Sequence, residues 1–566
     1  MLLIEADGKA LFAEHGIAVP RGVLATTPEL RELPGSGPWI VKAQVPVGGR
    51  GKAGGVLRCR TAEQVHTALR QLLGGRLKGH AVEACLVEQA VPGEERYLAV
   101  MVDAAGYGLR VIYANHGGVE IEQYGAAPGQ LCALDASAVA AALAAMTSND
   151  PPEQSQAIVA TGRKLASLLL QRELALAEIN PLFVTAAEYT AGDAKVVVDL
   201  NAIDRQPEIA ALIAARPGIY ADADRKLREG FDYVELDPQG EIGLVTTGAG
   251  LSMMLIDELA ARGGRPLNFC DIRTGQMRGS PARLMRVLEW IASRPSLRVV
   301  LVNIFAGITD LAEFATLLAT AVDNTPNLRV PVVARLVGRG ADEAKRILAE
   351  RQRNMLVTQD LEAALKLVVI TRDRNTVVDL DGEMDGGMRQ GTNGRDLSPV
   401  TRRRPNPGPK GSPSLPGDRA RDAIAILATL SRTTPAIVQG ITGRMGRTHA
   451  ALMRAYGTNI VGGTSTRTDT TNAAGVPVFP DCAAAARATG AVASVVMAPP
   501  AETRAAVQEA LDAGIKLIVT VAEGVPLHDA IRIGVATREA GAAWIGASTP
   551  GLAIPGELEH FHPEWK

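Results

Sequence analysis

The sequence predicts a multidomain protein of mixed α/β and α+β class. The chain has 566 residues, more than one hydrophobic core can organise, so several domains are expected. Short apolar runs alternate with helical patterns in two separate stretches, whereas the first part of the chain is less regular. A segment rich in Pro, Gly and Arg without apolar periodicity lies between the two stretches. We expect an α+β domain over 1–235, parallel-sheet domains over 236–370 and 422–566, and a flexible linker over 371–421.

The composition excludes several classes of protein. Acidic and basic residues nearly cancel at a formal net charge of −2, so nothing favours nucleic-acid binding. No apolar run reaches the length of a membrane span, and the N-terminus lacks the basic region of a signal peptide. The five cysteines are scattered, which argues against a disulfide framework and against a zinc site. We therefore expect a soluble, cytoplasmic protein.

The first domain begins with a helix and a strand that leads into a glycine-rich loop. The helix reaches about His15 and is closed by Gly16, and residues 39–42 form the strand. Further strands are expected over 85–89, 97–103, 109–113 and 195–199, and a helix is expected over about 153–171. Strands with interspersed helices of this kind are typical of an α+β domain.

The two later domains show the alternation of parallel sheets. Short apolar strands are expected over 242–246, 298–305 and 331–336, and then over 436–439, 493–497, 516–521 and 543–546. Helical patterns separate these strands, which predicts open sheets covered on both faces.

Two glycine-rich loops of different design stand near the opposite ends of the chain. The first covers residues 47–55 and the second covers residues 440–446. Glycine lets backbone amides approach an anion, and a following helix adds partial positive charge at its N-terminus. The loops therefore predict two different phosphate-bearing ligands.

The first domain also carries the residue types that ATP chemistry needs. Transfer from ATP requires cations at the phosphates and oxygen ligands for Mg²⁺. Such residues follow one another along the chain, and their order is more informative than any one of them: Lys42, Arg50, Lys52, Glu88, Glu95, Glu178, Asn180 and Asp199.

The sequences of these segments resemble the β subunit of the succinyl-CoA synthetase family, whose members are ATP-grasp enzymes. The matching phrases span residues 1 to 370: GPWIVK at 37–42, GGRGKAGG at 48–55, GGVEIE at 117–122, LALAEINPL at 174–182 and VNIF at 302–305. The resemblance implies an ATP-grasp domain followed by a flavodoxin-like domain. It also implies three kinds of site residue. The expected catalytic residues are Lys42, Arg50 and Lys52. ATP is expected to be held by Lys42, Gly49, Arg50, Gly51, Glu88 and Glu95, and Mg²⁺ by Asn180 and Asp199.

The flavodoxin-like domain has loops where a carboxylic acid is expected to bind. Residues 247–251 and 305–308 follow strands, and ligands of open sheets bind beyond the carboxyl ends of strands. The resemblance assigns Gly250 and Gly307 to the substrate carboxylate. Arg273 stands where the family has a glycine-rich turn and could add a bidentate anion donor. Two interpretations stay open: Arg273 binds an acid other than succinate, or it is a surface arginine without a ligand.

The last domain resembles the Rossmann-like CoA-binding domain of the α subunit of the same family. The matching phrases are QGITGRMG at 439–446, YGT at 456–458, VGG at 461–463, GVPVF at 475–479, AGIKLI at 513–518 and AEGVP at 522–526. The resemblance implies that CoA is held by Gly440, Thr442, Gly443, Arg444, Met445, Gly446, Arg467, Pro499 and Glu523. Residues 548–551 read STPG and depart from the family's turn at this place.

Enzymes of this family use a histidine that carries the phosphoryl group, and this sequence shows no counterpart of it. In the family it lies in a second α-subunit domain, and none of the eight histidines stands in that context. The favoured hypothesis is an ADP-forming acid–CoA ligase that uses ATP, Mg²⁺ and CoA and activates a small mono- or dicarboxylic acid through an acyl phosphate. A partner chain would supply the phosphohistidine domain, and a homo-oligomer is also open.

Two alternatives remain beside the favoured hypothesis. One is an ATP-grasp ligase that passes its acyl phosphate directly to an amine or another nucleophile. The other is a non-catalytic protein that binds CoA or a nucleotide. The favoured hypothesis agrees best with the motifs because both substrate-holding parts of the chain keep them.

Overall fold

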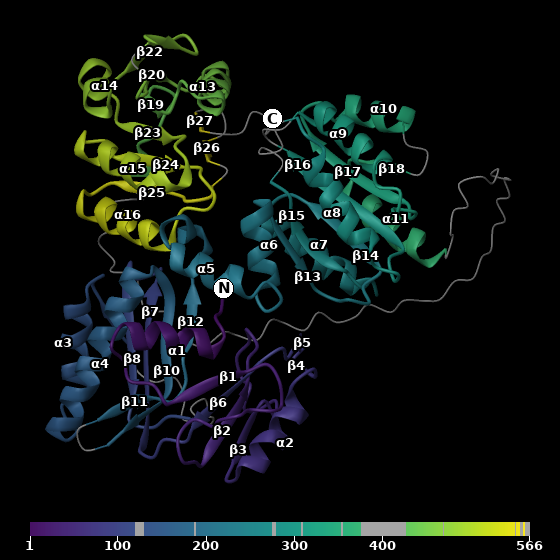
Figure 1. The fold of residues 1–566 in the computed structure, drawn as a ribbon. Helices are drawn as coiled ribbons and strands as arrows, with labels where there is room; N and C mark the ends of the chain where they lie inside the picture. Colours follow the sequence, from purple (N-terminus) through teal and green to yellow (C-terminus); the bar gives the residue numbers. More distant parts are fainter. Residues whose placement is uncertain are drawn as a thin grey trace, which may run out of the picture. The chain divides into compact units, whose positions relative to one another are not determined.

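The computed structural model describes the chain in stretches that form two compact units. The described residues are 1–118, 129–185, 188–273, 279–306, 310–351, 355–374, 426–467, 469–549, 551–554 and 558–560. One unit is Met1–Asp224 with Asp418–Pro563, and the other is Arg225–Gly417 with Glu564–Lys566 (Figure 1). The linker expected over 371–421 lies outside the described residues from residue 375 onward.

The chain begins with helix α1 (Glu5–Glu14) and a four-stranded antiparallel sheet in the order β1-β6-β2-β3. Its strands are β1 (Gly22–Ala25), β2 (Trp39–Ala43), β3 (Val56–Cys59) and β6 (Cys85–Gln89), and β4 (Arg76–Leu77) pairs with β5 (His80–Ala81) beside them. Helix α2 (Ala62–Leu72) packs its apolar face on this sheet, and Thr61 caps the helix by accepting a hydrogen bond from the Gln64 amide. The glycine-rich loop joins β2 to β3.

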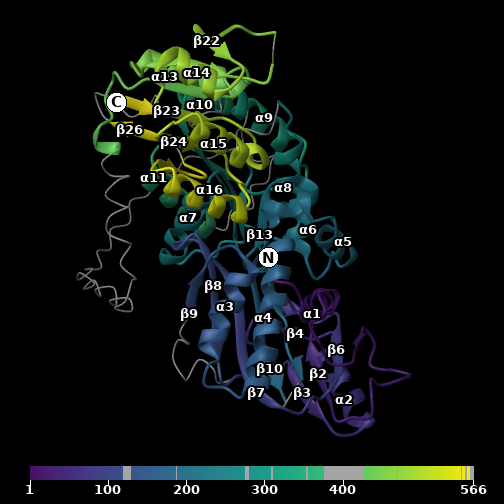
Figure 2. The same cartoon turned by 90° about the vertical axis from the view of Figure 1, so that its left-hand side faces the viewer.

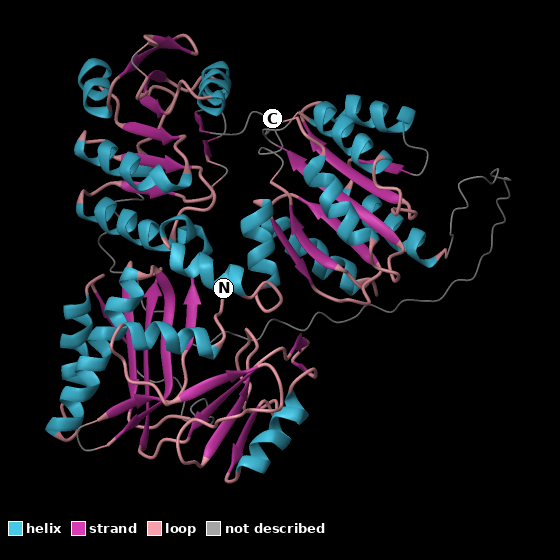
Figure 3. Ribbon diagram, viewed as in Figure 1, coloured by secondary structure: helices cyan, strands magenta, loops and turns pink. Residues whose placement is uncertain are grey.

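A larger antiparallel sheet completes the first domain. Its path is β11-β10-β7-β8-β9, with β12 also paired to β10: β7 (Glu94–Asp103), β8 (Gly108–Ala114), β9 (Gly129–Cys132), β10 (Leu174–Val184), β11 (Tyr189–Ala191) and β12 (Lys195–Val198). Helices α3 (Ala136–Met146) and α4 (Pro152–Gln171) cover one face of it (Figure 3). In the pairing of β10 with β12, Glu178 lies opposite Lys195. The short helices η2 (Leu200–Arg205), α5 (Pro207–Ala215) and α6 (Ala221–Glu229) follow.

The second unit contains a parallel sheet in the order β14-β16-β17-β18. The elements are β13 (Asp232–Glu235), β14 (Ile242–Thr246), α7 (Ala249–Ala261), β15 (Asn268–Asp271), α8 (Ala282–Ala292), β16 (Val299–Ala306), α9 (Leu311–Asp323), β17 (Val332–Gly338), α10 (Ala341–Arg351), β18 (Met355–Thr358) and α11 (Leu361–Asp373). Apolar clusters fill both faces of the sheet, which explains why its strands are continuous apolar runs.

The last domain is a sheet in the order β21-β22-β20-β19-β23-β24-β25, parallel except at β21. The strands are β19 (Ala436–Gln439), β20 (Ile460–Thr464), β21 (Asn472–Ala473), β22 (Val476–Phe479), β23 (Ala493–Val496), β24 (Leu517–Thr520) and β25 (Ala543–Ile545). The helices are α13 (Arg444–Tyr456), α14 (Cys482–Thr489), η4 (Pro500–Glu502), α15 (Thr503–Asp512) and α16 (Leu527–Glu539), of which α15 and α16 lie side by side (Figures 1 and 2). A hairpin of β26 (Leu552–Ile554) and β27 (Leu558–His560) follows.

The strand order of this domain reverses at β19, and open sheets of this kind bind ligands in a crevice at such a switch point. Strand β19 lies between β20 and β23, so the connections leave it toward opposite edges, which is the arrangement of a doubly wound nucleotide-binding fold. The expected mixed α/β and α+β class is therefore confirmed. Among the helices of the described stretches, none combines the length and apolarity that crossing a membrane requires.

Candidate active site

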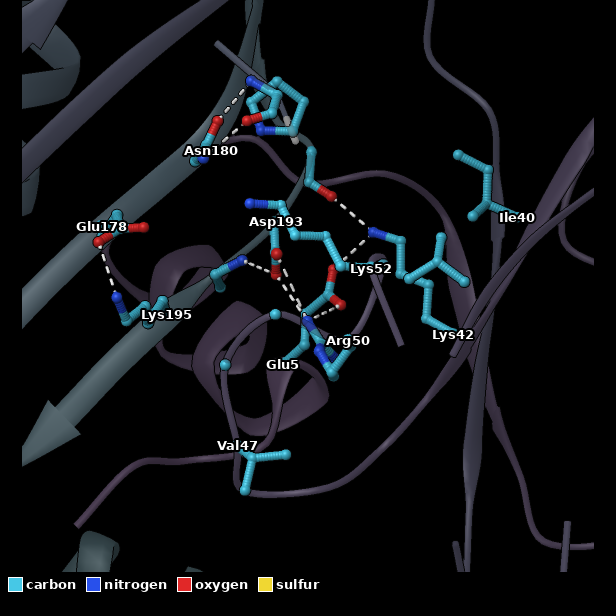
Figure 4. Close-up of a pocket in the computed structure, with 18 of the residues that line it drawn as sticks. Glu5, Ile40, Lys42, Val47, Arg50, Lys52, Glu178, Asn180, Asp193 and Lys195 are labelled. Atoms are coloured by element: carbon cyan, nitrogen blue, oxygen red, sulfur yellow. Dashed lines mark hydrogen bonds and ion pairs between the residues drawn. The ribbon is translucent and has the colours of Figure 1, made fainter. Parts of the chain in front are cut away.

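A cavity of about 700 Å³ lies in the first domain and brings together residues from both of its sheets. Lys42 of β2 and residues 47–52 of the glycine-rich loop line it, together with residues from the other sheet: Glu95, Tyr97, Glu178, Asn180, Asp193 and Lys195 (Figure 4). Basic side chains, loop amides and oxygen donors thus face one space. This arrangement suits a polyphosphate with a metal ion.

Lys42 is a buried cation held by two carboxylates. Its Nζ lies 2.6 Å from Glu5 Oε1 and 2.8 Å from Glu88 Oε2, and it donates to the Gly192 carbonyl at 2.7 Å. Burial opposes its charge, but Glu5 and Glu88 outweigh burial and raise the pKa of Lys42. Lys42 therefore stays protonated throughout the range in which a protein works.

Arg50 carries a second cation into the cavity from the glycine-rich loop. Its Nη2 donates to Glu5 Oε2 at 2.7 Å and to Asp193 Oδ1 at 3.0 Å. The backbone of Gly49 has φ +69°, and a Cβ there would come within 2.8 Å of Lys78 Nζ. Lys78 also donates to the Gly48 carbonyl at 2.8 Å, and the positive φ at position 49 is the backbone conformation that favours glycine.

Asn180 and Asp193 form the oxygen-rich side of the cavity. In the register that pairs Glu178 with Lys195, the next positions along the hairpin put Asn180 opposite Asp193, and Gly192 N donates to Pro181 O at 2.9 Å. Burial and the nearby charge of Glu5 raise the pKa of Asp193, although Arg50 opposes this. A side-chain amide oxygen and a carboxylate on neighbouring strands are suitable ligands for Mg²⁺.

Asp199, the expected metal ligand, lies elsewhere. It is not among the described residues that line the cavity. Its Oδ1 accepts a hydrogen bond from the Asn201 amide at 2.9 Å, and its Oδ2 accepts one from the Leu527 amide at 2.6 Å. The structure therefore brings Asn180 together with Asp193 and not with Asp199. Asp193 stands two residues before Lys195, and Asn180 stands two residues after Glu178, the partner of Lys195. This matching spacing is the signal in the sequence that could have pointed to Asp193.

Glu88 lies behind the cavity wall. It is only 2% exposed, and both of its oxygens contact Lys9 Nζ, at 2.5 and 2.7 Å. Among the described residues, neither Glu88 nor Lys9 lines the cavity, whereas Glu95, Gly51 and Lys52 do. Sequence reasoning also missed Glu5 and Lys9, because a helix at the N-terminus gave no chemical motif.

The parallel-sheet domain places Gly250 and Arg273 at the carboxyl ends of its first strands. Gly250 lies in the first turn of α7, and a Cβ added there would meet no atom within 4 Å. Arg273 is half-buried with φ +48°, and its Nη2 lies 2.9 Å from Asp232 Oδ2. Arg273 is therefore ion-paired and not a solvated surface residue. The third residue expected to bind the carboxylate, Gly307, lies outside the described residues.

The second glycine-rich loop joins β19 to α13 at the crevice of the last domain. Gly440 has φ +76°, Gly443 is the N-cap of α13, and a Cβ on Gly446 would come within 2.2 Å of the Gly440 carbonyl oxygen. The loop thus needs glycine at its first and last positions. Arg444 and Met445 form the exposed first turn of α13, where the helix N-terminus favours a phosphate.

The other residues expected to bind CoA follow neighbouring strands. Thr442 shares a hydrogen bond with Ser465 at 2.6 Å between their hydroxyl oxygens, which ties the loop to the end of β20. Pro499 follows β23 and Glu523 follows β24. Arg467 is exposed and lies 3.2 Å from Asp469 Oδ2. These positions all lie at carboxyl ends of parallel strands.

Comparison with known proteins gives three domain matches along the chain. Residues 2–184 match the model of the ATP-grasp domain, residues 245–369 that of CoA-ligase and residues 431–524 that of the CoA binding domain. The ADP-forming succinate–CoA ligase subunit beta of Desulfurococcus amylolyticus is 34% identical over 389 residues, which are 66% of this chain and 99% of that protein.

A second relative covers the same share of the chain. The corresponding subunit of Rubrobacter xylanophilus is 36% identical over 397 residues, covering 66% of this chain and 99% of that protein. A solved structure of ATP citrate lyase from Methanothrix soehngenii, in complex with citrate and coenzyme A, gives a TM-score of 0.49 at 15% identity, covering 65% of this chain and 99% of that chain.

Proposed function

The chain belongs to the family of ADP-forming succinate–CoA ligase β subunits and carries a CoA-binding domain in addition, and we propose that it is an ADP-forming acid–CoA ligase. It would activate a small mono- or dicarboxylic acid with ATP and join the acyl group to CoA. The observation that carries the proposal is the cavity in which Lys42, Arg50 and the glycine-rich loop face Asn180 and Asp193.

In this proposal the ATP phosphates bind along the glycine-rich loop. The amides of Gly49 and Gly51 and the cations of Lys42, Arg50 and Lys52 stabilise the charge of the transferring phosphoryl group. Glu95 lines the same cavity and remains a candidate contact of ATP. Glu88 acts from behind the wall, because its carboxylate is occupied by Lys9 and Lys42.

Asn180 and Asp193 would hold Mg²⁺. Both line the cavity. Asn180 Oδ1 accepts a hydrogen bond from the Gly118 amide at 2.6 Å, and the half-buried carboxylate of Asp193 pairs with Arg50. Mg²⁺ supplies charge neutralisation at the phosphates. We propose Asp193 in this role in place of Asp199, because Asp193 lines the cavity with Asn180 and Asp199 is not among the described residues that line it.

CoA would bind at the loop between β19 and α13. The exposed first turn of α13 with Arg444 and Met445 receives its phosphates, and Gly440, Gly443 and Gly446 allow the close approach. The remaining contacts would come from the neighbouring strand ends: Thr442, Arg467, Pro499 and Glu523.

The acid would bind at the carboxyl end of the parallel sheet of the second unit, with Gly250 and Gly307 near its carboxylate. Arg273 would provide the charge, because it stands at the end of β15. Its Nη2 donates to Asp232 Oδ2 at 2.9 Å, which helps to hold the guanidinium in place. A guanidinium is a planar cation whose N–H donors match the geometry of a carboxylate.

We further propose that a partner chain supplies a phosphohistidine domain. No histidine occurs among the described residues that line the ATP cavity. The experiment mixes the chain with proteins encoded beside it and follows ADP release with ATP, CoA and a panel of dicarboxylic acids. Stimulation by a neighbour supports the proposal. Turnover by the chain alone with an acid and an amine, and none with CoA, would point to direct acyl transfer instead.

A further inference from the structure

Glu5 divides its two carboxylate oxygens between two of the cations that line the ATP cavity, Lys42 and Arg50. Oε1 lies 2.6 Å from Lys42 Nζ, and Oε2 lies 2.7 Å from Arg50 Nη2 (Figure 4). The Glu5 side chain has no exposed surface, although the residue itself contributes to the cavity wall. The carboxylate of Glu5 therefore sets the distance between Lys42 on β2 and Arg50 in the glycine-rich loop.

We propose that Glu5 is a positioning residue of the ATP site, which holds Lys42 and Arg50 where they meet the terminal phosphates of ATP. This inference rests on the proposed function, because it takes ATP to be the ligand of the cavity. Glu5 itself does not touch the reacting atoms in the proposal.

Acidic and basic side chains are equal in number around Glu5. Three acids and three bases make the network: Glu5, Glu88 and Asp193 with Lys9, Lys42 and Arg50. Burial opposes the ionisation of Glu5, but Lys42, Lys9 and Arg50 hold its pKa well below the usual range. Glu5 is thus a permanent anion, and its position within α1 fixes where that anion lies.

Helix α1 is held in place by contacts that do not involve the Glu5 side chain. Leu3 N donates to the Val196 carbonyl at 2.9 Å, Ile4 N donates to the Tyr220 hydroxyl at 2.9 Å, and Ala6 N donates to Gln44 Oε1 at 2.9 Å. A change of the Glu5 side chain should therefore leave the helix docked, so its effect on the cavity can be measured separately.

Asp7 offers a matched control on the same helix. It is 2% exposed, and its Oδ2 accepts a hydrogen bond from the Tyr220 hydroxyl at 2.7 Å while Oδ1 lies 3.2 Å from Arg216 Nη2. It is not one of the cavity-lining residues of the described chain. Asp7→Asn thus disturbs a buried carboxylate of α1 without touching Lys42 or Arg50.

The test measures the ratio of the dissociation constants of AMP and MgATP for the full chain by calorimetry. Glu5→Asp keeps the charge but shortens the side chain, so it cannot bond both cations; we expect the ratio to fall at least fivefold. Asp7→Asn should leave the ratio within twofold. Should Glu5→Asp not fold, Glu5→Gln keeps the length without the charge and is expected to lower the ratio at least fivefold as well.

The outcomes separate the two levels of the proposal. If the folded Glu5 variant keeps the wild-type ratio, or if Asp7→Asn lowers it equally, Glu5 has no positioning role. If the wild-type chain does not prefer MgATP to AMP, the assignment of the cavity to ATP fails instead.

Discussion

Arg50 Nη2 lies 3.0 Å from Asp193 Oδ1, so one ion pair joins the glycine-rich loop to the turn before β12 inside the cavity. The contact balances a carboxylate that burial would otherwise disfavour. Asp193 is one of the acids that line the cavity together with Asn180.

Asp193→Asn should therefore weaken the Mg²⁺-dependent binding of ATP by at least about tenfold, because an oxygen ligand loses its charge. Calorimetric titration of ATP at several Mg²⁺ concentrations measures the effect. Asp199→Asn is the matched control and should change the affinity by less than about twofold, since its carboxylate lies outside the cavity. The reverse pattern would restore Asp199 as the metal ligand.

Much of the fold could be predicted from the sequence, and the site could be predicted in part. The strands at 242–246 and 436–439 occur as expected, because continuous apolar runs mark buried parallel strands. Asp199 ends a run of valines, a pattern that predicts a ligand at a strand end, but it is not among the described residues that line the cavity. Its contact with Leu527 joins positions 328 residues apart, which no local pattern reveals.

The buried ion pairs around Lys42 could not be predicted from the sequence for a similar reason. Glu5 and Lys9 stand one turn apart on α1, where an acid and a base usually form a solvated surface pair. Their burial follows from the packing of α1 beside β12, a contact between distant segments. The same packing turns Glu88 away from the ligand space and toward Lys9.

Lys42→Met should lower ADP formation by about 100- to 1000-fold, because a preorganised cation at the transferring group is lost. The affinity for CoA should stay unchanged, since the CoA residues lie in a separate domain. ADP release and CoA affinity, measured on the same preparation, check these two expectations. Loss of ADP formation together with loss of CoA affinity would mean that the variant is misfolded or that the two ligands share one site.

Gly446→Ala should lower the affinity for CoA by about tenfold or more, because the new Cβ would come within 2.2 Å of the Gly440 carbonyl oxygen and displace the loop. Gly443→Ala is the milder comparison, since its Cβ would lie 3.3 Å from the same oxygen. Fluorescence or calorimetric titration with CoA ranks the two variants. Equal affinities would contradict the need for close packing at position 446.

Arg273→Gln should raise the KM for the acid by about tenfold or more, because a charged hydrogen-bond donor to the carboxylate is lost. The dissociation constant of ATP should not change. Initial rates against acid concentration, with ATP and CoA saturating, measure the effect. An unchanged KM would leave Arg273 with a structural role in the pair with Asp232.

The stability of the first unit should fall below pH 6.5 through His528. Burial lowers the pKa of His528, although its contact with the Leu174 carbonyl opposes this, so the unfolded chain binds a proton at a higher pH than the folded one. Stability is then complete above about pH 6.5 and is lost as the pH falls, by at most about 1.4 kcal/mol per pH unit. In the His528→Gln variant, the free energy of unfolding should depend less on pH. Urea unfolding of both proteins at about pH 7.5, 6.5 and 5.5 measures this dependence. An identical slope in both proteins would assign the effect to other groups.

The most direct test of the ligase assignment is the stoichiometry of its products. The chain, together with a neighbour-encoded protein that carries a phosphohistidine domain, is incubated with ATP, CoA and a panel of dicarboxylic acids, and the products are separated by chromatography. We expect ADP, phosphate and one acyl-CoA in equal amounts, and none of them when CoA or the acid is left out. AMP as the nucleotide product, or ADP formed without acyl-CoA, would contradict the assignment.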